Sequence, residues 1–258
     1  MAAEKARALV IRTTAFGETS SVVGLYCREF GKLRALAKGA WRPKSGFDGG
    51  LDLLSSSQVL VLRKSSGGLD LLTEASLESR FRVGTSLAAV LGGLRVAELL
   101  DALTADADPQ PELFDVAHAT VRRLSGWSGD DSPVAALMIS LELALLRLTG
   151  HGPVLSRCAD CHEPLHGTGR TAFGMLDGGT LCDRCRGGRR GVVSVSPAAL
   201  AALRLLADRR VAADDVPLPA PVAGEVRGIM TTLLSHLVGR SLRVPATLAG
   251  GGRRARRP

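Results

Sequence analysis

The chain has 258 residues, and its 33 Lys and Arg against 25 Asp and Glu give a formal net charge of +8 at pH 7. This length suffices for two domains of ordinary size, and the positive charge favours an anionic partner: nucleic acid, a membrane surface or an acidic protein. The first residues lack the apolar run of a secretory signal, and no segment is apolar over the roughly 20 residues that a membrane-spanning helix needs. We therefore expect a cytoplasmic protein without a membrane partner.

The basic residues lie mainly at the two ends of the sequence. Residues 1–80 contain 12 basic and 8 acidic residues, residues 81–150 contain 5 and 9, and residues 151–258 contain 16 and 8. A net negative surface repels phosphate groups. We therefore expect the middle section not to be the main surface for a nucleic acid.

The first third of the chain has the pattern of a small β-barrel. Stretches rich in Val, Leu and Thr, separated by Gly or Ser, predict strands at 8–13, 20–28, 32–38, 57–64 and 69–77. A set of five short strands suits the oligonucleotide-binding (OB) fold, a Greek-key barrel that presents one face and its loops to single strands. Other small antiparallel barrels would give a similar pattern, so the strands alone leave the topology open.

The third predicted strand and the loop after it form a candidate nucleic-acid interface. In 32–38, basic residues alternate with apolar ones, and Gly39, Pro43 and Gly46 then end the strand in a loop that also carries Phe47. Cations neutralise phosphates, and flat rings stack on unpaired bases. A solvated basic strand and turn is the alternative. The candidate DNA-binding residues are Arg34, Lys38, Trp41, Arg42 and Lys44.

After residue 81 the period of the apolar residues changes from two to 3.6, which predicts helices. We place them at 85–104, 111–124, 133–148, 197–207 and 221–238, with Ser196 as the N-cap before Pro197. Residues 150–193 are expected to be irregular. The sequence thus predicts a barrel domain at 1–80, a helical domain at 81–249 with an inserted metal knuckle at about 153–190, and a disordered, arginine-rich tail at 250–258.

Two Cys-x-x-Cys pairs, separated by twenty residues, have the spacing of a four-cysteine zinc site. The predicted ligands are Cys158, Cys161, Cys182 and Cys185. A redox dithiol or an iron–sulfur cluster is the alternative, but four matched sulfurs favour one structural Zn²⁺ with no open coordination position. His162 and His166 lie inside the knuckle and could substitute as ligands, but with four cysteines available we expect each to be exposed or to contact a ligand without binding the metal. Cys27 is expected to be a buried apolar residue.

We expect no enzyme, because the sequence contains no phosphate-binding P-loop, no Gly-x-Ser-x-Gly elbow, no His-Glu-x-x-His and no dinucleotide-binding motif after a strand. Acidic pairs such as Glu98 with Asp101, and Asp106 with Asp108, have the residue types of a metal-dependent nuclease. A solvated helix face is the favoured interpretation. A zinc-ribbon protein that binds structured RNA in transcription or translation is a further alternative.

Several motifs near the N-terminus closely resemble those of the RecO family of bacterial DNA repair proteins. They are the segments 9–21, 31–32 and 37–45, followed by Phe47, by 50–51 and by 73–75, and the resemblance extends to the cysteine pairs. It implies an OB-fold barrel, a helical domain and, in zinc-bearing members, a metal knuckle in that domain. It also implies binding of single- and double-stranded DNA, annealing of strands coated by single-strand-binding protein, and RecA loading together with RecR, in association with the nucleoid.

The resemblance also assigns individual residues. It places Lys38, Arg42 and Lys44 on the DNA-binding face, with Arg34 and Trp41 as neighbours. Trp41 stands where many relatives have a basic residue, so that its ring either stacks on bases or packs against the protein.

The resemblance further implies a protein partner, the acidic C-terminal tail of single-strand-binding protein. Arg122 and Arg123 follow the aliphatic stripe of Leu113, Val116 and Val121, and Arg147 ends the next helix. Arginines beside an apolar groove suit a peptide that ends in a hydrophobic residue and a carboxylate. The alternative is that the aliphatic residues belong to the core.

Overall fold

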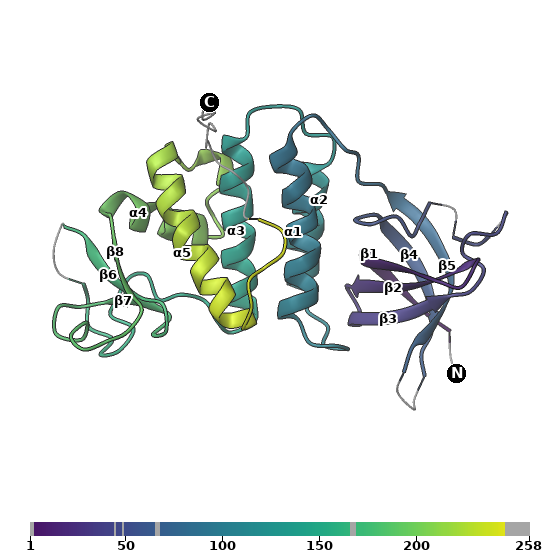
Figure 1. Ribbon diagram of the computed structural model, residues 1–258, viewed down its shortest axis with the longest axis horizontal. Helices are drawn as coiled ribbons and strands as arrows, with labels where there is room; N and C mark the ends of the chain where they lie inside the picture. Colours follow the sequence, from purple (N-terminus) through teal and green to yellow (C-terminus); the bar gives the residue numbers. More distant parts are fainter. Residues whose placement is uncertain (1–2, 44, 48, 65–67, 166–168, 246–258) are drawn as a thin grey trace, which may run out of the picture. The chain divides into compact units, whose positions relative to one another are not determined.

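The computed structural model describes residues 3–43, 45–47, 49–64, 68–165 and 169–245. The chain divides into two compact units, Met1–Ser128 and Gly129–Pro258 (Figure 1). Lys44, His166 and the tail at 250–258, all named in the sequence analysis, lie outside the described residues. No helix of the described ranges is both long and apolar enough to cross a bilayer.

The first unit begins with a closed barrel of five strands in the order β1-β2-β3-β5-β4, which is drawn in purple and blue in Figure 1. The long β1 pairs with β4 through its first half and with β2 through its second half. All neighbours are antiparallel except β3 and β5, which are parallel. The predicted OB-type barrel is therefore confirmed. Its strands are β1 (Ala3–Phe16), β2 (Ser20–Cys27), β3 (Gly31–Ala37), β4 (Ser56–Leu62) and β5 (Asp70–Ser79).

Alternating residues of the strands fill the barrel interior. In β3 the side chains of Leu33, Ala35 and Ala37 are buried, as the period of two predicts. Cys27 is also buried in this core, as expected. Phe47 lies on the loop after β3, but its ring is 6% exposed and belongs to the barrel core, so it offers no stacking surface. The expectation of an aromatic loop therefore holds for Trp41 and not for Phe47.

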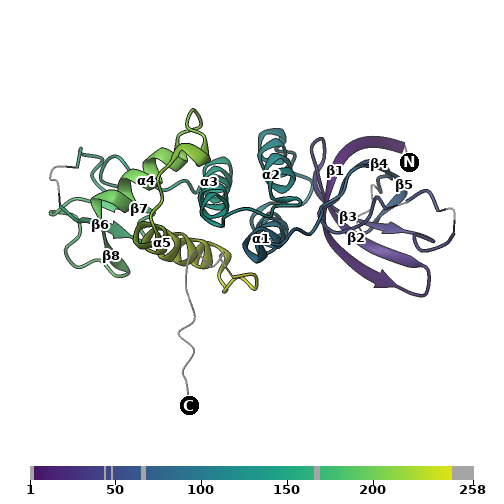
Figure 2. The same ribbon diagram turned by 90° about the horizontal axis from the view of Figure 1, so that it is seen from above.

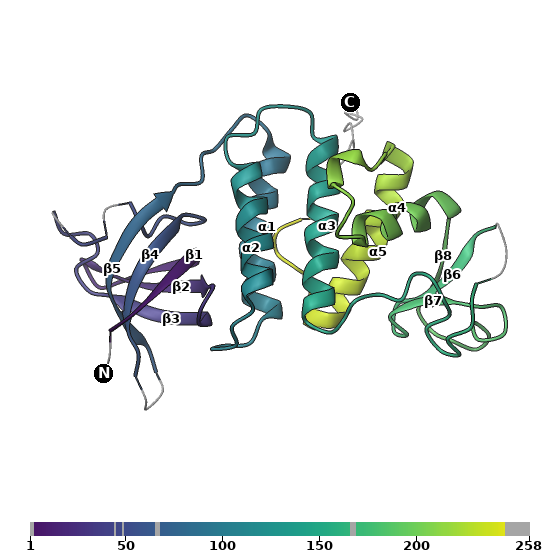
Figure 3. The same ribbon diagram turned by 180° about the vertical axis from the view of Figure 1, so that it is seen from behind.

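Two helices, α1 (Leu87–Leu103) and α2 (Pro111–Leu124), complete the first unit and run beside each other (Figures 1 and 3). The Ser86 hydroxyl accepts a hydrogen bond from the backbone N–H of Ala89 and so caps α1. Pro111 begins α2, where the missing N–H costs little. The division into compact units therefore places α1 and α2 in one unit with the barrel. The change from strands to helices nevertheless occurs near residue 81.

Ion pairs and one ring contact join the barrel to the α1–α2 hairpin. The Arg28 guanidinium donates two hydrogen bonds to the Asp115 carboxylate, at 2.9 and 3.0 Å. Nearby, the Tyr26 ring stacks on Phe114 with 6.3 Å between centroids. The contact between Arg28 and Asp115 is a bidentate, charge-assisted pair, which fixes the relative orientation of the two side chains as well as their distance.

Asp101, Asp106 and Asp108 of the α1–α2 hairpin are exposed, as the solvated-face interpretation expects, and two of them also contact a lysine of the barrel. The Lys32 ammonium donates to the Asp101 carbonyl at 2.6 Å and lies 3.5 Å from an Asp106 carboxylate oxygen. Gly31 allows this close approach, because its φ is +69° and a β-carbon there would overlap the carbonyl of Asp108.

The second unit combines a small three-stranded sheet with helices that pack against one another (Figure 2). Ser196 caps α4 and Pro197 begins it, as predicted. The expectation of an irregular segment at 150–193 is wrong, because this segment contains most of the β7-β6-β8 sheet (Figure 3). Strands of three or four residues are too short to give a readable period. The elements are α3 (Ser132–Leu148), β6 (Thr171–Gly174), β7 (Gly179–Leu181), β8 (Val192–Val195), α4 (Pro197–Ala207), η1 (Ala213–Asp215) and α5 (Ala220–Val238).

We predict that Gly31→Ala destabilises the first unit more than Gly17→Ala. Both glycines have positive φ, so alanine brings similar backbone strain of about 1–2 kcal/mol at each position. At Gly17 nothing lies within 4 Å of the added β-carbon, whereas at Gly31 it meets the Asp108 backbone. Urea denaturation of both full-length variants measures the difference. Equal losses of stability would contradict the close contact between the barrel and the hairpin.

Candidate nucleic-acid interface and metal centre

A row of two arginines crosses the outer face of β1, β2 and β3. Arg12 of β1 is paired with Gly24 of β2, and Gly24 is paired in turn with Arg34 of β3. Because Gly24 has no side chain, the two arginines face each other across β2 without an intervening residue. A β-carbon at Gly24 would lie 3.0 Å from that of Arg12. The arrangement presents two guanidinium groups on the face that OB folds use for oligonucleotides.

The basic face continues into the loops at one end of the barrel. Lys38 follows β3 on the same side as Arg34, and both side chains are exposed. The loop after β3 is tied to the β1–β2 turn, because the Trp41 N–H donates to the Thr19 carbonyl at 3.0 Å. The Gly39 N–H also donates to the Ser20 hydroxyl at 3.1 Å. The two loops therefore form one rim.

The structure places four of the five predicted binding residues on this face and rim. Arg34, Lys38, Trp41 and Arg42 are all exposed there, whereas Lys44 lies outside the described residues. The side chain of Arg34 is 67% exposed, with an Asp106 oxygen at 3.9 Å. The Asp106 carboxylate of the α1–α2 hairpin therefore offsets part of the positive charge of Arg34.

Sequence reasoning missed two residues of the same face, Arg12 and Phe16. Both are exposed on β1, with Thr14 between them, so their spacing of four residues puts them on one side of the strand. This alternation is readable in the sequence. The sequence does not show which residues lie opposite Arg12 across β2, because this depends on the register of the strands.

A second group of cations lies beside the start of β3. Arg63 and Lys64, from the segment after β4, line a hollow of about 540 Å³ together with Lys32 and Arg34. The Arg63 guanidinium lies over the Phe30 ring, 5.2 Å from its centroid. This contact is in the range of a cation–π interaction, which fixes the position of the charge.

The outer face of β4 and β5 has the opposite charge. Glu78 accepts a hydrogen bond from Gln58 at 2.8 Å and pairs with Arg7 at 3.1 Å. Burial alone would raise the pKa of Glu78, but these partners lower it below its ordinary value. Since Glu74 is exposed on the same strand, this face repels phosphates, and the face of β1, β2 and β3 is the better anion surface.

The four predicted cysteine ligands come together in the second unit. Their sulfur atoms all lie within 4.8 Å of one another, and those of Cys161 and Cys182 are 3.8 Å apart. Zn–S bonds of about 2.3 Å in a tetrahedron require sulfur atoms about 3.8 Å apart. A disulfide would need about 2.05 Å, and none of the cysteines is in a disulfide. The four cysteines are therefore placed to bind one metal ion through their four thiolates.

The backbone shapes this site and lowers the pKa of a thiol in it. The Cys182 N–H donates to the Cys158 sulfur at 3.4 Å. Burial would raise the pKa of Cys158, but N–H groups of Cys182 and Cys161 lower it to about 6. Among the described histidines, His162 is not part of the ligand cluster. The thiolate form of Cys158 is the form that binds a metal.

The ribbon segment, residues 153–195 around the four cysteines, is a weaker anion surface than the barrel. It contains six arginines and four acidic residues, and four thiolates around Zn²⁺ add a net charge of −2. Arg189 pairs with Asp160 and Asp177, each at 2.8 Å, and Arg186 pairs with Asp183 at 3.3 Å. With the metal bound, this segment is close to neutral.

Comparison with known proteins gives concordant matches over nearly the whole chain. The family model "Recombination protein O N terminal" matches residues 1–81, and "Recombination protein O C terminal" matches residues 84–245. The chain is 35% identical over 262 residues to the DNA repair protein RecO of Rhodopirellula baltica, covering 92% of this chain and 96% of that one. It is 33% identical over 240 residues to RecO of Anaeromyxobacter dehalogenans, covering 92% of each.

We predict one tightly bound metal ion, zinc, per chain. The fully buried residues of the apolar cluster around the cysteines are just Cys158, Ala172 and Leu181 among the described residues, so we expect the ribbon to depend on the metal for its stability. Structural zinc contributes on the order of 10 kcal/mol. Cys182→Ser should therefore release the metal and unfold the ribbon while the barrel stays folded, as elemental analysis and hydrogen exchange would report.

His162→Asn is the matched control for this prediction. It changes a residue of the same knuckle that lies outside the sulfur cluster, and asparagine tolerates its φ of +61°. This variant should keep the metal. Iron in the freshly purified protein, or loss of metal from the His162 variant, would contradict the four-cysteine zinc site.

Proposed function

The chain belongs to the RecO family of DNA repair proteins, and we propose that it acts in recombinational repair by binding and annealing DNA. In this proposal it binds single- and double-stranded DNA without a sequence preference and anneals complementary strands coated by single-strand-binding protein. Together with RecR it promotes the loading of RecA, in the cytoplasm at the nucleoid. These activities are those of the family that the sequence motifs indicate.

The observation that carries the proposal is the row of Arg12, Gly24 and Arg34, which continues into Lys38 and Arg42 at the rim. These side chains offer positive charge along one face of the barrel. Phosphates carry no base information, so contacts of this kind bind DNA of any sequence. Annealing is driven by base pairing and requires no chemical step from the protein. The proposed role is therefore non-enzymatic.

We assign the metal a structural role. Four cysteine sulfurs would complete the tetrahedron of one Zn²⁺ and leave no open position for a substrate or water. The ion would hold the two cysteine turns on either side of β6 and β7. The four-sulfur cluster is also distinct from the basic face of the barrel, because it lies in the other compact unit.

A hollow in the first unit is our candidate binding site for the acidic tail of single-strand-binding protein. The stripe named in the sequence analysis is mostly core, since Leu113 and Val121 are 0% and 3% exposed. Leu113 and Val121 therefore leave little apolar surface for a peptide along that stripe. Arg122, however, lines a separate hollow of about 550 Å³ between the end of β5 and α2.

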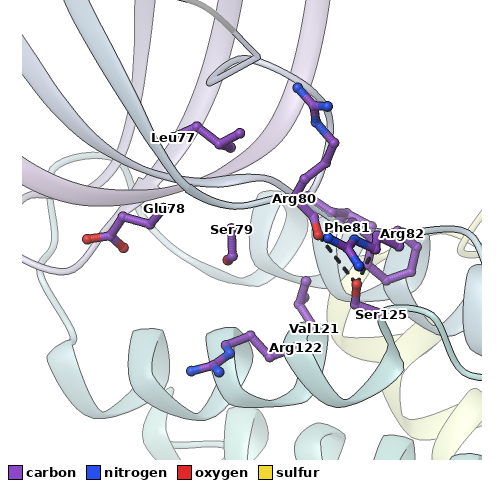
Figure 4. Close-up of a pocket in the computed structure, with 10 residues that line it drawn as sticks. Leu77, Glu78, Ser79, Arg80, Phe81, Arg82, Val121, Arg122 and Ser125 are labelled. Carbon is purple, nitrogen blue, oxygen red and sulfur yellow. Dashed lines mark hydrogen bonds between the residues drawn. The ribbon is translucent and has the colours of Figure 1, made fainter.

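This hollow has the two kinds of groups that an acidic peptide with an apolar end needs. Figure 4 shows Leu77, from β5, on one side and Val121 and Arg122, from α2, on the other. Arg80 and Arg82 also line it, and so does Glu78, whose carboxylate is paired with Arg7 at 3.1 Å. Guanidinium groups bind carboxylates in a bidentate way, and apolar walls accept a hydrophobic side chain. Arg147, named with these arginines from the sequence, belongs to the second unit.

For the DNA face, we predict that Lys38→Glu combined with Arg42→Glu weakens DNA binding and slows annealing of coated strands in the absence of ATP. Each lost phosphate contact lowers the slope of log affinity against log salt by about 0.7 on single strands, so the pair lowers it by about 1.4. The melting temperature should barely change, because exposed charges contribute little to stability. Fluorescence anisotropy at several salt concentrations gives the slope.

Lys5→Glu is the matched control for the DNA face. Lys5 is exposed on the half of β1 that pairs with β4, away from the row of arginines. Its replacement should leave the salt slope and the annealing rate unchanged. An equal effect of this variant would mean that overall charge, rather than this face, determines binding.

For the tail, we predict that Arg122→Glu abolishes binding of the acidic tail peptide and slows annealing of coated strands, with naked strands affected far less. Repulsion between the new carboxylate and the peptide is the physical reason. The neighbouring Arg123→Glu makes the same charge change at a residue that does not line the hollow, so it should retain peptide binding. Equal loss on coated and naked strands would show that Arg122 serves DNA or the fold instead.

A further inference from the structure

Two aromatic rings stand exposed on the rim of the barrel. All nine aromatic residues of the sequence belong to the described part of the chain. Two of them, Phe16 and Trp41, are more than half exposed, each at 55%, whereas Tyr26 and Phe47 of the same barrel are 0% and 6% exposed. Single exposed aromatics are common, but one at the end of β1 and one on the adjoining loop call for an explanation.

Fixed backbone holds the tryptophan in this position. Ala40 and Phe47, on either side of Trp41, are 8% and 6% exposed and belong to the barrel core. The Trp41 N–H is hydrogen-bonded to Thr19, and the Ser45 hydroxyl donates to the Ala40 carbonyl at 3.0 Å. The ring is thus presented to solvent by an anchored loop, which lowers the entropy lost when a ligand packs on it.

A hollow and positive charges adjoin the ring. The hollow measures about 610 Å³ and is lined by Trp41, Arg42 and Pro43, with the buried Phe47 and Leu51 at its apolar wall. Phe16 ends β1 on the face that carries Arg12, and its turn is hydrogen-bonded to the tryptophan loop. Flat apolar surface and cations therefore occur together.

We propose that Trp41, with Phe16 beside it, is a stacking platform for unpaired bases, through which the barrel prefers single-stranded DNA to duplex. The ligand that fits has flat apolar rings at regular spacing along an anionic backbone, and single-stranded nucleic acid has both. An acidic peptide lacks the regular rings, and a duplex keeps its base faces inside its own stack. This inference rests on the proposed DNA-binding face and adds a contribution that phosphate contacts do not supply.

The test compares a thymidine oligonucleotide with an abasic oligonucleotide of the same length. The wild-type protein should bind the base-bearing strand more tightly, because the abasic strand keeps its phosphates and loses its rings. Trp41→Ala should lower affinity for the base-bearing strand by roughly 5- to 150-fold, the range of one base stacked on one ring. Its affinity for the abasic strand should fall far less, so that the preference for bases shrinks.

Three further variants separate stacking from other causes. Trp41→Phe keeps a ring and should restore most of the preference for bases, whereas Lys38→Glu should weaken both strands by a similar factor. Trp127→Phe leaves Trp41 as the one tryptophan, and stacking should then quench its fluorescence with thymidine strands and not with abasic strands. Circular dichroism shows whether each variant is folded.

The outcomes distinguish this inference from the proposed function. If Trp41→Ala keeps the wild-type ratio of the two affinities while the salt slope still depends on Lys38 and Arg42, the platform is refuted and the DNA face stands. If the wild-type protein binds neither strand, the proposed function itself fails. A loss that is equal on both strands would assign Trp41 to shaping the loop, and the stacking platform would be abandoned.

Discussion

Ion pairs between the barrel and the α1–α2 hairpin decide where the first unit can bind phosphate. Acidic residues of the hairpin form ion pairs with Arg28 and Lys32, and an Asp106 oxygen also lies 3.9 Å from Arg34. Arg28 and Lys32, at the β2–β3 end of the barrel, are thereby largely neutralised, because each has a carboxylate within salt-bridge distance. The positive face is strongest at the other end, at Lys38 and Arg42. The acidic middle of the sequence therefore pairs with, and partly neutralises, the basic residues of the first 80 positions.

Much of the fold was predictable because it rests on local signals. Pro111 and the pair Ser196–Pro197 mark helix starts that the structure places at the expected residues, since a capping hydroxyl and a missing N–H act within one turn. The β6–β8 sheet was not predictable, because its strands are too short to show a period. The cysteine spacing located the metal centre without this sheet, because four sulfurs need just two turns brought together.

The binding face was half predictable for a related reason. Lys38 and Arg42 follow from the alternation of one strand and the loop after it. That Arg12 lies opposite Arg34, however, depends on the register of three strands, and a shift by one residue would reverse the face of every side chain. The burial of Phe47 depends on a loop that returns to the barrel core. Both features are set by tertiary contacts between residues far apart in the sequence.

The two kinds of contact on the barrel would respond differently to the product of annealing. The proposed phosphate contacts at Lys38 and Arg42 would form with single strands and with duplex alike. Stacking on Trp41 requires an unpaired base, and each stacked base contributes about 1–3 kcal/mol. When two strands pair, that contribution would end while the ionic contacts would remain, so we expect the affinity to fall as the product forms. A barrel that combined both contacts would thus hold the separate strands more tightly than the duplex they become.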